Sequence, residues 1–381
     1  MPVYTKDAPF LATLRENRKL NREGSAKDTR HFVVDLTGSG LTYTCGDSIG
    51  ILPENSPHSV EALITAGGFD PEELVTVPKV EEPVSLREAL TRYLAIAAPS
   101  KKALQTFLDT TSSESEKEFL TDLLAKENAE TTKLYLENRE YLDLFIEFPG
   151  VRLSGVQLVA LLRRLVPRLY SIASSPMLYP DEVHLTVAVV RYETNGKSRE
   201  GVASTWLSDR VTLDDPRVPV FISNSHFGIP ADPQTDLIMV GPGTGVAPFR
   251  SFIQEQKARQ GTGRCWLFFG DQHQVSDFLY EEEFAAALSD GSLHRLDTAF
   301  SRDQEQKVYV QDRMRENGRE LWEWLEKGAS FFVCGDASRM ARDVDTALHQ
   351  IVAEHGNLTP EEAGAYVKKL RSDKRYQKDV Y

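Results

Sequence analysis

Cysteine is nearly absent from this sequence. Its 381 residues include 3 cysteines, Cys45, Cys265 and Cys334. Their number is odd and no two form a C-x-x-C pair, so we expect no disulfide framework, zinc site or other bound metal. Scarce cysteine is typical of a reducing compartment, and we therefore expect a cytoplasmic protein.

Long apolar runs and an excess of positive charge are also missing. No stretch is long enough to cross a bilayer, and no apolar segment of a signal peptide follows the first residues (MPVYTKD). The 44 Lys+Arg against 57 Asp+Glu give a net charge of −13, which argues against a nucleic-acid or anionic-membrane surface. The length suggests two or three globular domains.

The first half of the chain changes from strand to helix and back. Residues 29–36 (TRHFVVDL) and 49–52 are strand-like, whereas apolar residues recur at helical spacing from about 59 to 165. Ser59, Ser85 and Ser154 each occupy a predicted N-cap. Strand patterns return in residues 168–174 and 183–192. Since neither strand segment is long enough to fold separately, we interpret the helical stretch as an insertion into one β domain.

The second half alternates buried strands with helices. The strands are predicted at residues 235–241, 265–271, 293–301 and 330–336, with helices between them. This alternation predicts a doubly wound parallel sheet. Residues 360–381 add one more helix and an extended end.

Three segments have the composition of a cofactor site, although each is also compatible with a structural role. Residues 168–175 (RLYSIASS) form a strand that offers a cation, a ring and a hydroxyl, but the same alternation occurs in half-buried strands. Residues 201–207 (GVASTWL) place small residues at a helix start, which suits a diphosphate or a plain turn. The loop of residues 241–248 (GPGTGVAP), which includes Gly243 and Thr244, lies between a strand and a helix and favours nucleotide binding.

Three further segments are ambiguous when taken singly. Ser301, Arg302, Lys307, Tyr309 and Gln311 suit a phosphate monoester or a solvated charged loop. Residues 334–336 (CGD) end a strand, where cysteine is usually only a small core residue. The last residues, 375–381 (RYQKDVY), belong to a chain end that normally frays.

The order of these segments resembles the ferredoxin–NADP reductase-like half of the diflavin reductase family. The resemblance rests on RLYSIASS, GVAST, GPGTGVAPFRSF, FFGD with DFLYEEEF, SRDQEQKVYVQ, FVCGDASRMARDV and RYQKDVY, preceded by YTKDAP, RHFVVDL and YTCGD. The closest likeness is to the sulfite reductase flavoproteins. The family normally has proline where Cys45 stands, so we expect a slightly looser turn there. The flavodoxin-like FMN domain that normally precedes YTKDAP is absent from this sequence.

The resemblance implies a fold with three parts. Residues 1–55 and 151–232 would form an antiparallel FAD-binding β-barrel, residues 56–150 a helical connecting insertion, and residues 233–381 a doubly wound NADPH-binding domain.

The resemblance also implies residue roles. The positions that would hold FAD are Asn21, Asn55, Arg168, Leu169, Tyr170, Ser171, Thr186, Val187, Ala188, Tyr192, Gly201, Val202, Ala203, Ser204 and Tyr381. The positions that would read the 2′-phosphate and the rest of NADPH are Ser301, Arg302, Lys307, Tyr309, Gln311 and Asp343. Catalytic roles fall to Ser171, Cys334, Asp379 and Tyr381.

The implied reaction is hydride transfer from NADPH to FAD, followed by single-electron transfer to a separate acceptor such as a flavodoxin, a ferredoxin-like protein or a haem protein. Tyr381 would stack on the flavin where nicotinamide must dock. One alternative is a ferredoxin- or flavodoxin–NADP reductase, although simple reductases lack the helical insertion. The other is a non-catalytic flavin-binding assembly subunit, which need not retain all four catalytic positions. The acceptor, the direction of electron flow, the oligomeric state and any role of sulfite are not readable from sequence.

Overall fold

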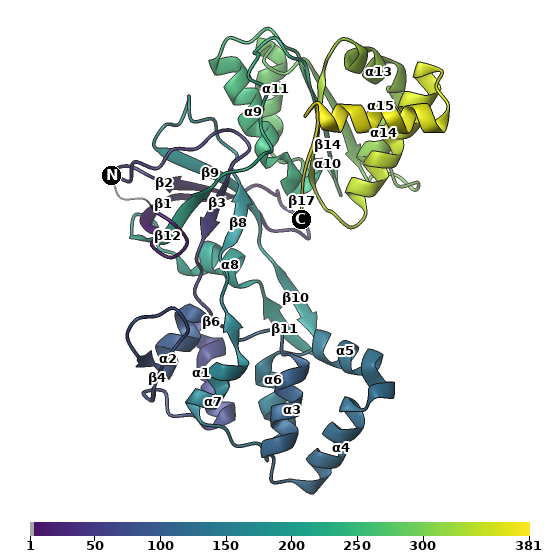
Figure 1. The fold of residues 1–381 in the computed structure, drawn as a ribbon. Coiled ribbons are helices and arrows are strands. Elements are labelled where there is room, and N and C mark those ends of the chain that lie inside the picture. Colours follow the sequence, from purple (N-terminus) through teal and green to yellow (C-terminus); the bar gives the residue numbers. More distant parts are fainter. Residues whose placement is uncertain (1–3) are drawn as a thin grey trace. The chain divides into compact units, whose positions relative to one another are not determined.

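A computed structural model describes residues 4–381, which form two compact units (Figure 1). The first unit contains Met1–Ile51, Leu169–Val189 and Val211–Tyr381, described from residue 4 onward. The second contains Leu52–Arg168 and Val190–Arg210. Among residues 4–381, no helix is both long and apolar enough to cross a bilayer.

The first sheet is antiparallel and has six strands in the order β8-β3-β12-β1-β2-β9. Its strands are β1 (Phe10–Lys19), β2 (Thr29–Asp35), β3 (Ser48–Ile51), β8 (Arg168–Ser171), β9 (Glu182–Ala188) and β12 (Pro216–Ser223). Just beyond β8, the Ala173 N–H donates to the His184 carbonyl of β9 at 2.8 Å and so links the two outer strands. Side chains such as Leu14, Phe32 and Ile49 are fully buried inside. The predicted β-barrel is confirmed.

The second sheet of the first unit is parallel, with the order β15-β14-β13-β16-β17. Its strands are β13 (Leu237–Val240), β14 (Cys265–Asp271), β15 (Arg295–Phe300), β16 (Ser330–Gly335) and β17 (Tyr376–Val380). Its helical segments are η4 (Gly243–Val246), α9 (Ala247–Ala258), α10 (Gln274–Asp277), α11 (Glu281–Asp290), α12 (Val310–Glu316), α13 (Gly318–Glu326), α14 (Met340–Gly356) and α15 (Pro360–Ser372).

Both faces of the parallel sheet are buried, which explains the nearly continuous apolar strands. Ile238 and Val240 pack in one core with residues of α12 to α15, while Leu237 and Met239 pack in another with residues of α9 and α11. The strand order reverses between β13 and β16, because the chain adds β14 and β15 on one side and then crosses to the other. The predicted doubly wound fold is confirmed.

The second unit is mainly helical. Its helical segments are α1 (Pro57–Gly67), α2 (Leu86–Glu88), η1 (Ala89–Tyr93), α3 (Lys101–Thr110), α4 (Glu114–Leu124), η2 (Lys126–Asn128), α5 (Ala129–Glu137), α6 (Tyr141–Glu147), α7 (Gly155–Leu161), α8 (Val202–Thr205) and η3 (Trp206–Arg210). Its strands are β4 (Leu74–Val75), β5 (Val84–Ser85), β6 (Leu94–Ala95), β7 (Arg163–Arg164) and the hairpin β10 (Arg191–Thr194) with β11 (Lys197–Glu200).

Two of the three predicted helix caps are present. The hydroxyls of Ser85 and Ser154 accept hydrogen bonds from the Glu88 and Gln157 N–H groups. The prediction of an N-cap at Ser59 was wrong, because the N-cap of α1 is Ser56 and Ser59 lies inside the helix. The first helical residue is Pro57, whose fixed φ and missing N–H suit that position.

Candidate functional site

The glycine loop lies where the parallel sheet reverses its strand order. It follows β13 and leads through η4 into α9. A Cβ on Gly245 would lie 2.2 Å from the Cys334 carbonyl oxygen, so only glycine permits the loop to approach the end of β16 this closely. Gly243 has φ +56, which also favours glycine. A crevice at a topological switch point is where open α/β sheets bind their ligands.

Ser171, Cys334 and Asp379 meet at this edge of the sheet. Cys334 on β16 pairs in register with Asp379 on β17. The Ser171 hydroxyl donates to the Asp379 carboxylate at 2.8 Å, and the Cys334 sulfur lies 3.9 Å from the same oxygen. Burial, with the Asp379 charge, raises the pKa of the Cys334 thiol well above its usual value, so the sulfur stays protonated and uncharged. Three of the four predicted catalytic residues are therefore in contact.

Tyr381, the fourth, is held by its backbone while its ring is exposed. Its N–H donates to the Gly335 carbonyl, and its own carbonyl accepts from the Ala337 N–H, each at 3.1 Å. Its hydroxyl lies 3.1 Å from the Thr244 hydroxyl of the glycine loop. The residue is 66% exposed. A ring anchored in this way can turn aside without disturbing the strand.

The predicted 2′-phosphate residues cluster after β15. The Ser301 and Arg302 N–H groups donate to the carbonyls of Asp271 and Gln272, each at 2.9 Å, which fixes the turn. The side chains of Arg302 and Lys307 are exposed, and neither forms an ion pair or hydrogen bond with any described residue. Two unpaired cations on an anchored turn suit a phosphate.

The remaining predicted NADPH residues begin two helices. Tyr309 precedes α12 and is 45% exposed, whereas Gln311 in its first turn is 9% exposed. Asp343 is exposed in the first turn of α14.

The predicted flavin residues on β8 and β9 differ in how accessible they are. On β8, Arg168 and Leu169 are exposed, and Tyr170 and Ser171 are half-buried. On β9, Thr186 and Val187 are buried and Ala188 is exposed.

Among the predicted FAD positions, Thr186 and Asn21 are held by side chains of the segment that follows β14. The Thr186 hydroxyl lies 2.7 Å from the Tyr280 hydroxyl. Asn21 is buried; its amide donates to Asp277 at 2.9 Å and its oxygen accepts from the Thr29 N–H at 2.6 Å.

The second unit contains the other predicted FAD residues. Gly201 caps α8, in which Val202, Ala203 and Ser204 follow, and a Cβ on Gly201 would lie 2.8 Å from the Val190 Cβ. Nearby, a cavity of about 250 Å³ is lined by residues that include Asn55 and Val202. The Asn55 amide donates to two carbonyls, while its buried Oδ1 has no hydrogen-bond partner. The orphaned Asn55 acceptor fits a ligand with polar hydrogens, whereas the close approach to Val190 explains why residue 201 is glycine.

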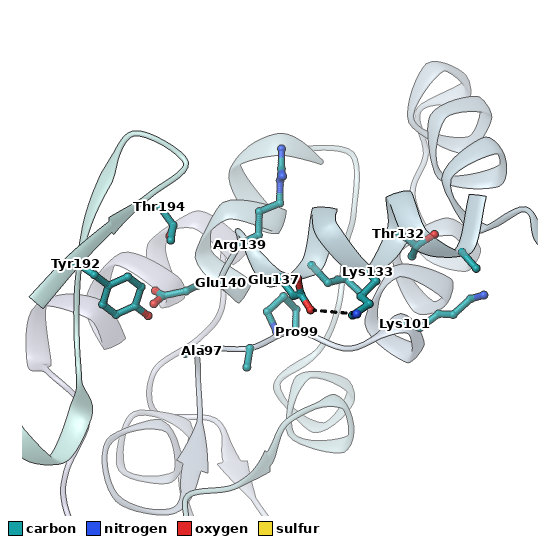
Figure 2. A pocket seen from close by; sticks show the side chains of 13 residues that line it. Ala97, Pro99, Lys101, Thr132, Lys133, Glu137, Arg139, Glu140, Tyr192 and Thr194 are labelled. Carbon is teal, nitrogen blue, oxygen red and sulfur yellow. Dashed lines mark ion pairs between the residues drawn. The ribbon is translucent and has the colours of Figure 1, made fainter. Parts of the chain in front are cut away.

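A second cavity in this unit, of about 590 Å³, was not predicted (Figure 2). Tyr192 and Thr194 of the hairpin line one side of it. The rest is lined by residues 97–99 and Lys101 around the start of α3, by α5, which includes Lys133, and by the loop after α5. Of these, sequence reasoning identified Tyr192 alone. The others belong to no sequence motif, and they can be recognised as cavity-lining residues only from the folded structure.

Two family models match the chain. One, described as "FAD binding domain", matches residues 2–206, and the other, "Oxidoreductase NAD-binding domain", matches residues 239–346.

Curated relatives match almost the whole chain. The "Sulfite reductase [NADPH] flavoprotein alpha-component" of Bacillus subtilis is 47% identical over 379 residues, which cover 99% of this chain and 62% of that protein. The protein of that name from Vibrio cholerae is 46% identical and covered to 60%, and that from Escherichia coli is 43% identical and covered to 62%. This chain therefore spans 60–62% of the length of these relatives.

Proposed function

Because the chain belongs to the FAD-binding domain family and carries an oxidoreductase NAD-binding domain behind it, we propose that it transfers a hydride from NADPH to FAD and passes the electrons singly to a separate protein. Its cofactors are FAD and NADPH, and its class is NADPH-dependent flavin oxidoreductase. We assign residues 1–55 and 151–232 to FAD binding, 56–150 to the connecting insertion and 233–381 to NADPH binding.

The observation that carries the proposal is the contact of Ser171, Cys334 and Asp379 at the switch point of the parallel sheet. A hydroxyl, a neutral thiol and a carboxylate there come from three segments distant in sequence. A protein that only held a flavin would have no need of this cluster.

The residues present fit both cofactors. In the first unit, the glycine loop and the two free cations Arg302 and Lys307 suit a phosphorylated dinucleotide. In the second unit, the orphaned Asn55 oxygen, beside the cavity that Val202 also lines, suits a hydrogen-bond donor of FAD. When bound, FAD supplies the exchange between two-electron and one-electron chemistry.

The side chains of the cluster have distinct roles in hydride transfer. The Asp379 carboxylate would favour a positive charge on a nicotinamide bound at this edge of the sheet. The Ser171 hydroxyl, held at 2.8 Å from Asp379, could donate to a flavin nitrogen instead of to that carboxylate. The Cys334 thiol stays uncharged, so it would not repel a nicotinamide ring placed beside it.

Tyr381 acts as a gate in this proposal. Its exposed ring would lie where nicotinamide must dock and would have to move before hydride transfer. Displacing the ring costs NADPH and NADH the same free energy, so Tyr381→Ala should raise kcat/KM for both by a similar factor. Because only NADPH gains the phosphate contacts, NADPH displaces the ring at concentrations at which NADH does not. At such a concentration Tyr381→Ala should speed flavin reduction by NADH more than by NADPH, and an unchanged ratio of the two rates would refute the gate.

The physiological acceptor is a second proposal. The relatives carry the name of an NADPH–sulfite reductase flavoprotein, and we therefore favour a haem protein that reduces sulfite as the electron acceptor. A flavodoxin or a ferredoxin-like protein is the second choice. A ferredoxin- or flavodoxin–NADP reductase remains the alternative. The three cysteines are all unpaired and buried, which supports a cytoplasmic location.

The deciding experiment is anaerobic titration of the purified chain, loaded with FAD, by NADPH or NADH. Visible flavin bands that bleach with NADPH and much less with NADH would support the proposal, and ferricyanide should then reoxidise the protein. Bound flavin that never bleaches would favour a binding subunit. Failure to bind FAD would refute the cofactor assignment.

A further inference from the structure

The edge strand β17 presents its side chains alternately to two different surroundings. Tyr376, Lys378 and Val380 point to the α14 and α15 side of the sheet, where Tyr376 and Val380 join the same core as Phe331. Gln377 and Asp379 point to the opposite side. Among the strands of residues 4–381, β17 pairs with β16 alone, so side-chain contacts must supply the rest of its anchorage.

On the helix side, Asp345 binds two side chains of β17 and one of α15. Its Oδ1 accepts from the Tyr376 hydroxyl at 2.7 Å and from Lys378 Nζ at 2.9 Å, both on β17, and from Arg371 Nη2 of α15 at 2.5 Å. Partial burial opposes ionisation, but the three donors outweigh it and lower the pKa of Asp345 to about 2. The carboxylate therefore remains charged throughout the working range of pH.

On the opposite side, β17 contacts the barrel part of the same unit. The Gln377 side chain accepts from the Gly228 N–H at 3.0 Å and donates to the Gly228 carbonyl at 3.2 Å. Two residues on, Asp379 accepts from Ser171. Since β-strand side chains alternate strictly, a shift of β17 that moves Tyr376 or Lys378 also moves Asp379.

We propose that Asp345 is a positioning residue for hydride transfer: by binding Tyr376 and Lys378 it fixes the register of β17 that places Asp379 against Ser171. Asp345 lies on the far side of the sheet from Ser171 and does not touch the reacting groups. The inference rests on the proposed function, because it assumes that the Ser171–Asp379 contact serves NADPH oxidation.

The test compares Asp345→Asn with Glu354→Gln, which changes an exposed carboxylate on the same helix that has no ion pair or hydrogen bond with the described residues. We expect Asp345→Asn to slow anaerobic flavin reduction at saturating NADPH by about tenfold or more, since small misplacements of reacting groups are costly. Its bound FAD should be unchanged. Tyr376→Phe, which removes one donor, should slow the reaction less.

Hydrogen exchange supplies a readout that does not depend on activity. In Asp345→Asn, backbone amides of residues 376–381 should exchange faster, while those of β13 stay protected. Glu354→Gln should match the wild type in both assays.

Three results would overturn the inference. Asp345→Asn could reduce its flavin at the wild-type rate, whatever its melting temperature. It could raise only the KM for NADPH, which would place its effect in binding. Flavin reduction could be slower without faster hydrogen exchange in β17, which would mean that Asp345 does not act by holding this strand. If the proposed function itself fails, the flavin bands of the wild-type protein will not bleach with NADPH. That result would overturn both the proposed function and the role of Asp345.

Discussion

Replacing Asp143 by alanine should destabilise the helical unit strongly. Asp143, on α6, is fully buried, and its carboxylate accepts from Lys197 at 2.6 Å and from Arg199, both on β11. It also accepts from the Glu140 N–H at 2.8 Å. These contacts join the hairpin that carries Tyr192 to the helices behind it.

The size of the loss in unfolding free energy follows from the buried charge that the substitution leaves without its partner. The Arg199 side chain is 5% exposed and would remain a buried cation. Breaking a buried pair in this way costs about 3–5 kcal/mol. Glu140, 3.1 Å from Arg199, partly compensates, so we expect about 3 kcal/mol. At roughly 2–4 °C per kcal/mol, the melting temperature of this unit should fall by about 6–12 °C.

Urea and thermal denaturation followed by circular dichroism measure this loss. Glu114→Ala is the control, since its pair with Lys117 at 2.7 Å is exposed and should contribute about 0–1 kcal/mol. The double variant Asp143→Ala/Arg199→Met should recover much of the loss, because it removes the stranded cation. A loss below about 1 kcal/mol for Asp143→Ala would refute the reasoning.

Three further predictions concern the first unit. Gly245→Ala should weaken NADPH binding in a fluorescence titration while FAD stays bound, because the new Cβ meets the Cys334 carbonyl. Arg302→Ala should lower kcat/KM for NADPH on the order of 10- to 100-fold and leave NADH unaffected. Burial lowers the pKa of His31 to about 2 and that of His184 to about 4. Both histidines are neutral in the native state, whereas in the unfolded chain each takes up a proton below its pKa of about 6.5. Lowering the pH to 5 should therefore reduce the free energy of unfolding by about 2 kcal/mol per histidine, measured by urea denaturation. Equal free energies of unfolding at pH 7.5 and pH 5 would contradict this.

Much of the fold could be predicted because its signals are local. The apolar runs of β13, β14 and β16 arise from burial on both sheet faces, and Gly243 and Gly245 occupy a loop that needs glycine. The end of the chain was predicted only as extended. That it forms the parallel strand β17 depends on pairing with β16, a contact that no local pattern encodes.

In the candidate site, too, individual residues could be predicted from the sequence, whereas their contacts could not. Ser171 and Asp379 could be named one by one through the resemblance, yet their contact spans 208 positions and required the folded sheet. Asp345 and Asp143 belong to no motif, because each acts through donors that only the tertiary structure brings to it. The roles assigned to the individual cofactor residues remain predictions.

The position of the helical insertion has a consequence for folding kinetics. β3 and β8 are neighbours in the barrel, yet the chain from Leu52 to Pro167 separates them. Closing a flexible loop on the order of a hundred residues costs about 4 kcal/mol of chain entropy. If the insertion is already folded, most of that entropy has been lost before the strands meet. We therefore expect the helices to form first and the barrel to close late, as the slow step in refolding.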